Sequence, residues 1–176
     1  VDLAHRLDRE TSGCLLLALD GEALRLLNTQ IKGNQVEKRY LCLLDGTMKH
    51  DLLDVDEPIG SFERAGQRFM RVDQAGKPAH TTFRLLQNYG QYSFVEAQLH
   101  TGRTHQIRVH AAHLGMPLAG DKRYSPADRQ KFWKKKGLKR MFLHAHQVSF
   151  YTAGGEQQLV SSHLPDNLSQ LLENLP

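Results

Sequence analysis

Short alternating apolar segments dominate the first hundred residues of the chain. The unbroken apolar run from Cys14 to Leu19 has the length of a strand that is buried on both faces. Residues 36–44 and 92–99 alternate between apolar and polar positions, which predicts two strands that each bury one face. Between residues 45 and 90, further short alternating segments are separated by Gly, Pro and Asp, as in an antiparallel meander. This part of the chain is therefore predicted to form a sheet.

Helical spacing of apolar residues appears in three other segments. Residues 21–33 carry leucines and an isoleucine on one side between two glycines, and four leucines recur after Pro165. Between them, a helix is expected to begin at the N-cap Thr104 and to end at Gly115. Two more strand-like segments lie between residues 141 and 160. The combination predicts an α+β fold with a mixed, mainly antiparallel sheet and flanking helices.

The helix after Thr104 places a charged residue where an apolar one is expected. At 100° per residue, Gln106, His110 and His113 share a polar side, whereas Arg108 lies between alanines on the opposite, apolar side. Burying a guanidinium without a carboxylate partner costs roughly several kcal/mol of folding free energy. Arg108 therefore either pairs with an acid or reaches water past the small alanines.

Composition and charge narrow the class of protein. The 176 residues are 40% hydrophobic and 24% charged, which fits one soluble globular domain. Cys14 and Cys42 both lie in apolar segments, so we interpret them as reduced core thiols and expect a cytoplasmic protein. The longest apolar run is too short to cross a bilayer, so no membrane partner is expected. A net charge of +4 favours, mildly, a polyanionic partner such as nucleic acid.

A basic tract follows near residue 130. Residues 129–140 contain seven Lys and Arg residues, among them Lys134, Lys135 and Lys136, and no acid. Such a run is often only a solvated face. Here Phe132 and Trp133 are interleaved with the positive charges, which favours contact with RNA through phosphates and stacked bases.

The ten histidines do not predict a metal site. No thiol or carboxylate completes a recognisable ligand set around the histidine pairs that share a face, which are His110 with His113 and His144 with His146. Glycine-rich loops that bind phosphate or dinucleotides are also missing from the sequence. We therefore expect no metal and no cofactor, and chemistry that needs only side chains.

The segment HRLDRETSG at residues 5–13 is the strongest candidate for chemistry. It places the carboxylate of Asp8 between Arg6 and Arg9, just before an apolar run. Asp8 could simply cap a turn. The flanking arginines favour its charged form, however, and a charged carboxylate suits a nucleophile or a base better than a proton donor.

Several motifs in order give this segment a family resemblance. Together with KRY, GKP, TGRTHQIRVH and LHA, it resembles the RluA-type RNA pseudouridine synthases over nearly the whole chain. The resemblance is closest to the RluC-like branch, which acts on large-subunit ribosomal RNA, chiefly through GKP and GLKRMFLHA. KRY occupies residues 38–40, GKP residues 76–78, TGRTHQIRVH residues 101–110, GLKRMFLHA residues 137–145 and LHA residues 143–145.

The resemblance implies an isomerase that converts uridine to pseudouridine in structured RNA. Asp8 would be the essential acid, Arg108 would neutralise and orient it, and Tyr40 would stack on the extruded base or handle a proton. Arg6 would occupy the gap left by the flipped nucleotide. Arg9, Arg103, His105 and the lysines of the basic tract would bind RNA. From the residues alone, a packed strand tyrosine is the favoured interpretation of Tyr40, and the chain could also be a noncatalytic RNA-binding module on the same fold.

The resemblance also bears on domain organisation. Proteins of this family carry further strands ahead of the HRLDRETSG motif and often a small separate RNA-binding domain, whereas this chain starts at Val1, four residues before the motif. We expect residues 1–176 to be a pseudouridine synthase catalytic domain, apparently without these parts. A monomer is the expected oligomeric state.

Overall fold

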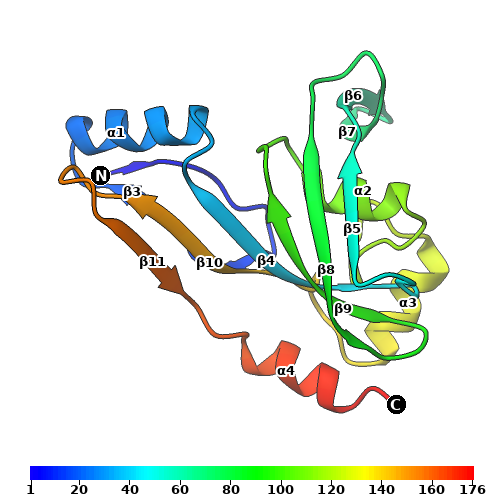
Figure 1. Ribbon diagram of the computed structural model, residues 1–176. Helices are drawn as coiled ribbons and strands as arrows, with labels where there is room; N and C mark the ends of the chain where they lie inside the picture. The colour runs from blue at the N-terminus through cyan, green and yellow to red at the C-terminus, as the bar shows by residue number, and fades with distance from the viewer.

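A computed structural model, which describes residues 1–176, contains one large, mainly antiparallel sheet (Figure 1). The α+β fold predicted from the sequence is confirmed. Only β2 (Ser12–Gly13) pairs in parallel, alongside β10. Across the sheet, the other strands follow in the order β11 (Gln157–Ser161), β10 (Leu143–Tyr151), β4 (Glu37–Leu44), β9 (Ser93–Leu99), β8 (His80–Asn88) and β5 (Leu52–Asp56).

The register of β4 at the centre of the sheet fixes which side chains share a face. Tyr40 lies opposite Ala97 of β9 and Ala145 of β10. Since side chains alternate along a strand, Lys38 shares the face of Tyr40, as expected. Lys38 and Tyr40 both line the same cleft. This face therefore provides one wall of a site.

Two smaller sheets stand beside the large one. β1 (Asp2–Leu3) pairs with β3 (Leu17–Ala18). β6 (Ile59–Arg64) and β7 (Gln67–Val72) form a hairpin that projects from the large sheet beyond β5 (Figure 1). The hairpin turn uses positive φ angles at Ala65 and Gly66. The short strands expected between residues 45 and 90 are present, but the expected meander is wrong, because β5 pairs with β8 and the β6–β7 hairpin between them forms a sheet of its own.

Four helices flank the sheets. They are α1 (Gly21–Lys32), α2 (Gln106–His113), α3 (Ala127–Lys135) and α4 (Asp166–Glu173). Ile107 and Ala111 of α2 belong to the main core with residues of β4, β8 and β9, whereas Trp133 of α3 and Leu168 of α4 belong to a second core. None of the helices is long and apolar enough to cross a membrane.

The predicted buried strand from Cys14 to Leu19 is wrong. Only Leu17 and Ala18 are in strand conformation, and Leu15, Leu17 and Leu19 are exposed. Ala18, in contrast, is buried. This segment lies outside the large sheet and buries only alternate residues, a pattern that an unbroken apolar run does not reveal. Cys14 is accordingly half-buried, so it is not the core thiol that we expected, whereas Cys42 is fully buried.

The helix after β9 also differs from the prediction. It begins at Gln106, and its N-cap is His105 in the left-handed conformation, with φ 56°, rather than Thr104. The predicted polar side is only partly in solvent. His113 is exposed, but Gln106 and His110 are buried, and both hydrogen-bond to Thr81 of β8, which offsets the cost of burying polar groups.

Candidate active site

The turn that carries Asp8 is pinned to the large sheet. The Thr11 N–H donates to the Asp8 carbonyl at 3.0 Å, and the next residues pair with β10 as β2. Gly13 has φ 113°, and a Cβ atom there would overlap the Ala145 carbonyl. The glycine therefore permits the close approach of the two backbones. This approach fixes the position of Asp8, whose side chain remains 28% exposed.

Arg108 of α2 joins Asp8 to a second carboxylate. Its Nε and Nη2 atoms each donate to Asp121 at 2.9 Å, and its Nη1 lies 3.5 Å from Oδ2 of Asp8. The predicted proximity of Arg108 and Asp8 is confirmed. Burial alone would lower the pKa of Arg108, but the hydrogen bonds and charge of Asp121, with the charge of Asp8, raise it instead. Arg108 therefore stays charged and does not reach water as a snorkelling residue.

Asp121 is the site residue that sequence reasoning missed. It is fully buried in the loop after α2, and its Oδ1 also accepts the backbone N–H groups of Arg123 and Tyr124. An Asp that accepts N–H groups two and three residues ahead is typical of an Asx turn. That local signal was present in the sequence. It did not reveal that the same carboxylate would hold Arg108.

Tyr40 lies close to the same charges. It is 6% exposed, lines the same cleft as Asp8, and its hydroxyl has no hydrogen-bond partner within the chain. Burial, the nearby Asp8 carboxylate and Cys14 all raise the pKa of Tyr40. The hydroxyl therefore keeps its proton at neutral pH, so Tyr40 can donate a hydrogen bond or pack against a planar ring, but it is a poor base.

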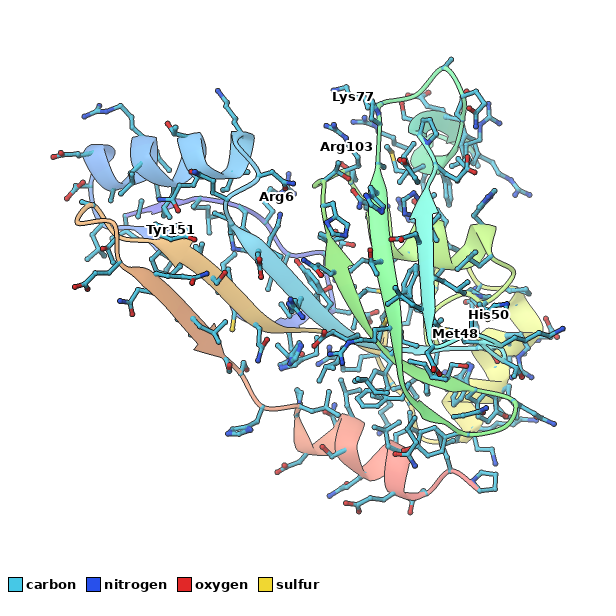
Figure 2. The ribbon with its side chains drawn as sticks, viewed as in Figure 1. Arg6, Met48, His50, Lys77, Arg103 and Tyr151 are labelled. Atoms are coloured by element: carbon cyan, nitrogen blue, oxygen red, sulfur yellow. The ribbon has the colours of Figure 1, made fainter.

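Asp8 and Tyr40 open into a cleft of about 870 Å³. Its size lies within the range of roughly 300–1,000 Å³ that is usual for ligand sites. Basic side chains surround it, and Figure 2 shows two of them, Arg6 near the end of α1 and Arg103 beyond β9. The predicted RNA-binding residues that line this cleft are Arg6, Arg9, Arg103 and His105.

The contacts of these basic residues differ. Arg6 and Arg9 are exposed and have no acid within 4.0 Å, whereas Nε of Arg103 donates to the Pro78 carbonyl at 2.8 Å. His105 bonds through Nδ1 to the Tyr124 hydroxyl at 2.6 Å. Burial and the Arg108 charge lower the pKa of His105, so at neutral pH it adds no charge.

Lys38 is a further cleft residue to which the sequence gave no role. It is half-buried on the face of Tyr40, and no acid lies within 4.0 Å of its ammonium. Burial lowers the pKa of this ammonium. Its position on the Tyr40 face was predicted, but the lack of a partner depends on tertiary structure.

The basic tract lies elsewhere. Lys134, Lys135 and Lys136 are exposed on α3 and just after it, and they line neither of the two main clefts. The predicted base-stacking role of Trp133 is wrong. Trp133 is fully buried, and its Nε1 donates to Asp45 at 3.0 Å, because the ring completes the second core.

One cluster could be mistaken for a metal site. Ligand atoms of Asp54, His80 and His100 all lie within 4.8 Å of one another. His80 bonds to Asp54 at 3.0 Å and His100 to the Thr82 hydroxyl at 2.8 Å. The Thr82 hydroxyl also donates to Asp54, so both imidazoles already have hydrogen-bond partners within the cluster, and their rings stack with centroids 4.3 Å apart. We therefore interpret the cluster as a hydrogen-bonded network.

Comparison with known proteins decides the family. The family model of RNA pseudouridylate synthases matches residues 1–113, which include Asp8, Tyr40 and Arg108. The chain belongs to the RNA pseudouridylate synthase family. The resemblance inferred from the motifs is thus confirmed, and the constellation of Asp8, Tyr40 and Arg108 lies within the matched part of the chain.

Curated relatives agree with this family. The ribosomal large subunit pseudouridine synthase C of Haemophilus ducreyi is 37% identical over 177 residues, and that of Escherichia coli K12 is 38% identical over 179. Each alignment covers 99% of this chain but only 55% and 56% of the relative. The chain therefore spans about half the length of the curated relatives that it matches.

Solved structures of pseudouridylate synthase domains share the fold. The human RNA pseudouridylate synthase domain containing 1 superposes with a TM-score of 0.81 at 29% identity, over 99% of this chain and 79% of that one. The human RNA pseudouridylate synthase domain containing 4 gives 0.80 at 27% identity, over 99% and 75%.

Proposed function

We propose that this chain isomerises uridine to pseudouridine in structured RNA. The bond between ribose C1′ and N1 of the base breaks, a bond from C1′ to C5 forms, C5 loses its hydrogen and N1 gains one. No redox change or co-reactant is needed. We further propose that residues 1–176 act as the catalytic domain, as a monomer and in the cytoplasm.

The observation that carries the proposal is the convergence of three side chains at an open cleft. Asp8 faces the cleft, Arg108 stands 3.5 Å behind it, and Tyr40 lines the adjoining wall. A noncatalytic RNA-binding module has no need to place a paired carboxylate among cations that bind a polyanion. A carboxylate there repels phosphate, so its presence favours chemistry over binding alone.

The proposed roles follow from these environments. Asp8 acts as a nucleophile or proton acceptor, because its carboxylate faces the cleft and lies 3.5 Å from the Arg108 guanidinium. Arg108 holds Asp8 in place and is itself held by Asp121. Tyr40, which stays protonated, packs against the flipped base or gives it a hydrogen bond. A flipped nucleotide is required because the reacting atoms of a stacked uridine are out of reach.

Arg6 and three other residues that line the cleft are proposed to hold the RNA. Arg6 is exposed and unpaired, so its planar guanidinium is free to fill the gap that the flipped uridine leaves. Arg9, Arg103 and His105 contact the backbone. As the substrate we propose large-subunit ribosomal RNA, because the curated relatives are named ribosomal large subunit pseudouridine synthases.

The test uses ribosomal RNA that carries tritium at C5 of uridine. The proposed reaction releases tritium to water, and reverse transcription after carbodiimide treatment then maps the modified positions. Release of tritium from large-subunit fragments, with discrete stops, is the expected result. RNA binding without release would favour the noncatalytic module.

A further inference from the structure

A second basic hollow lies next to the first cleft. We call it the hairpin cleft; it measures about 810 Å³ and lies beside the β6–β7 hairpin. It shares Arg9 and His105 with the first cleft. Asp8 lines the first cleft and Arg108 lines the hairpin cleft. The two hollows therefore meet at the Asp8–Arg108 pair.

The hairpin cleft has an excess of unpaired positive charge. Five of its lining residues are Arg or Lys, and Glu10 is the one acid. Arg108 is paired with Asp121, and Lys122 lies 2.8 Å from Glu10. The lining arginines that have no acid within 4.0 Å are Arg9, Arg64 and Arg123.

Part of this surface is held rigidly. Arg123 donates from Nη1 to the Arg68 carbonyl at 2.7 Å, and its guanidinium lies over the Phe69 ring, 4.8 Å from the centroid. These contacts fix a cation without neutralising it. A guanidinium held in place loses less entropy when it binds, and its planar fork matches the oxygens of a phosphate.

Tyr124 links the hairpin to the candidate active site. Its hydroxyl accepts the Met70 N–H of β7 at 3.1 Å and bonds to His105 at 2.6 Å. Its ring packs against the Arg108 guanidinium, whose Cζ is 5.1 Å from the centroid. The hairpin is thus positioned by the same residues that surround Arg108.

We propose that the hairpin cleft binds the phosphodiester backbone of the RNA strand as it continues from the uridine in the first cleft. The inference rests on the proposed function for the identity of the ligand. An extended strand that places its base at Asp8 must leave past one side of that residue, and the hairpin cleft offers arginines there. Arg64 and Arg123 are the proposed phosphate ligands.

The first experiment compares RNA affinity in two single arginine variants that each remove one charge, and then in a double variant of the hairpin cleft. Arg64→Gln removes an exposed, unpaired cation of the hairpin cleft. Arg71→Gln removes a charge from the same hairpin, but Arg71 lies 3.8 Å from Asp73 and lines neither cleft. We expect Arg64→Gln, combined with Arg123→Gln, to weaken binding of a stem-loop roughly tenfold, about 1.4 kcal/mol. The salt slope should fall by about 0.7 per lost contact, and Arg71→Gln should change neither.

The second experiment locates the phosphates. Methylphosphonates replace the phosphates one by one on both sides of the target uridine. One or two neighbouring positions should weaken binding to the wild-type protein and have no effect on Arg64→Gln. If the loss from each methylphosphonate simply adds to the loss from Arg64→Gln at every position, the proposal is overturned. It is also overturned if an acidic peptide displaces the RNA from the hairpin cleft as readily as unlabelled RNA does, which would indicate a protein partner.

These binding measurements are independent of turnover. If the wild-type protein binds RNA with the expected coupling but forms no pseudouridine, the proposed function fails and the hairpin cleft stands. If pseudouridine forms but Arg64→Gln binds RNA as tightly as the wild type does, the proposed function stands and the proposal for the hairpin cleft fails. The single Arg64→Gln variant keeps the test decisive if Arg123→Gln disturbs the hairpin.

Discussion

The guanidinium of Arg108 is held by Asp121 through two hydrogen bonds of 2.9 Å, while Asp8 approaches only its remaining nitrogen at 3.5 Å. Asp8 is therefore not the main counter-ion of Arg108. Because Asp121 makes both hydrogen bonds to Arg108, the Asp8 carboxylate remains partly exposed to the cleft. It also means that the charge beside Asp8 depends on a residue that does not line that cleft.

Asp121→Asn should destabilise the protein strongly, because it leaves the buried Arg108 guanidinium with one carboxylate, that of Asp8 at 3.5 Å. Removing one partner of a buried ion pair costs about 3–5 kcal/mol. Urea denaturation measures the change, and Asp128→Asn on the exposed surface of α3 is the control. A loss below about 1 kcal/mol would show that Asp8 alone suffices for Arg108.

Gly13→Ala should separate β2 from β10, because the new Cβ would overlap the Ala145 carbonyl. The Asp8 turn would shift, and tritium release should fall much more than RNA affinity. Gly90→Ala is the matched control, since Gly90 also has a positive φ but has open space around it. Equal effects of both substitutions would show that backbone strain, about 1–2 kcal/mol per residue, is the whole cause.

Acid should destabilise the protein as the pH falls below 6.5. His110 is fully buried, with Nδ1 bonded to Thr81 and Nε2 to the Glu57 carbonyl, and burial lowers its pKa. Below the unfolded value of 6.5, the unfolded chain takes up a proton that the folded chain resists, so stability is lost towards lower pH. The same direction holds for His5, His100, His105 and His144.

Urea titrations at pH 7.5 and 5.5 measure this dependence. His110→Gln should flatten the fall in the free energy of unfolding between these two values, whereas His113→Gln, on the exposed end of α2, should not. If His110→Gln leaves the pH dependence unchanged, His110 does not contribute to it.

Contact of the basic tract with RNA stays a prediction, and the position of α3 indicates which RNA should reach it. Lys134, Lys135 and Lys136 line neither cleft, so a short stem-loop seated at Asp8 need not reach them. Neutralising all three should weaken binding of a long ribosomal RNA fragment and lower its salt slope by about 0.7 to 0.9 per contact. Short stem-loops should bind as before. An unchanged slope with the long fragment would identify the tract as solvated surface.

How much the sequence could predict depended on the range of the interaction. Alternation along residues 36–44 correctly placed Lys38 and Tyr40 on one face, because that pattern is local. The apolar surroundings of Arg108 correctly required an acid. They could not choose Asp121, since a loop 13 residues away supplies that carboxylate through tertiary structure. The unbroken apolar run from Cys14 to Leu19 likewise could not show whether the segment is buried on one face or on both, because every position in it is apolar.

The central claim is that Asp8 carries out the isomerisation while the surrounding cations bind the RNA. Asp8→Asn keeps the size of the side chain and removes its charge. We predict that this variant binds a large-subunit ribosomal RNA stem-loop within a few-fold of the wild type but releases no tritium from uridine labelled at C5. Tritium release by Asp8→Asn at a rate close to that of the wild type would contradict the account.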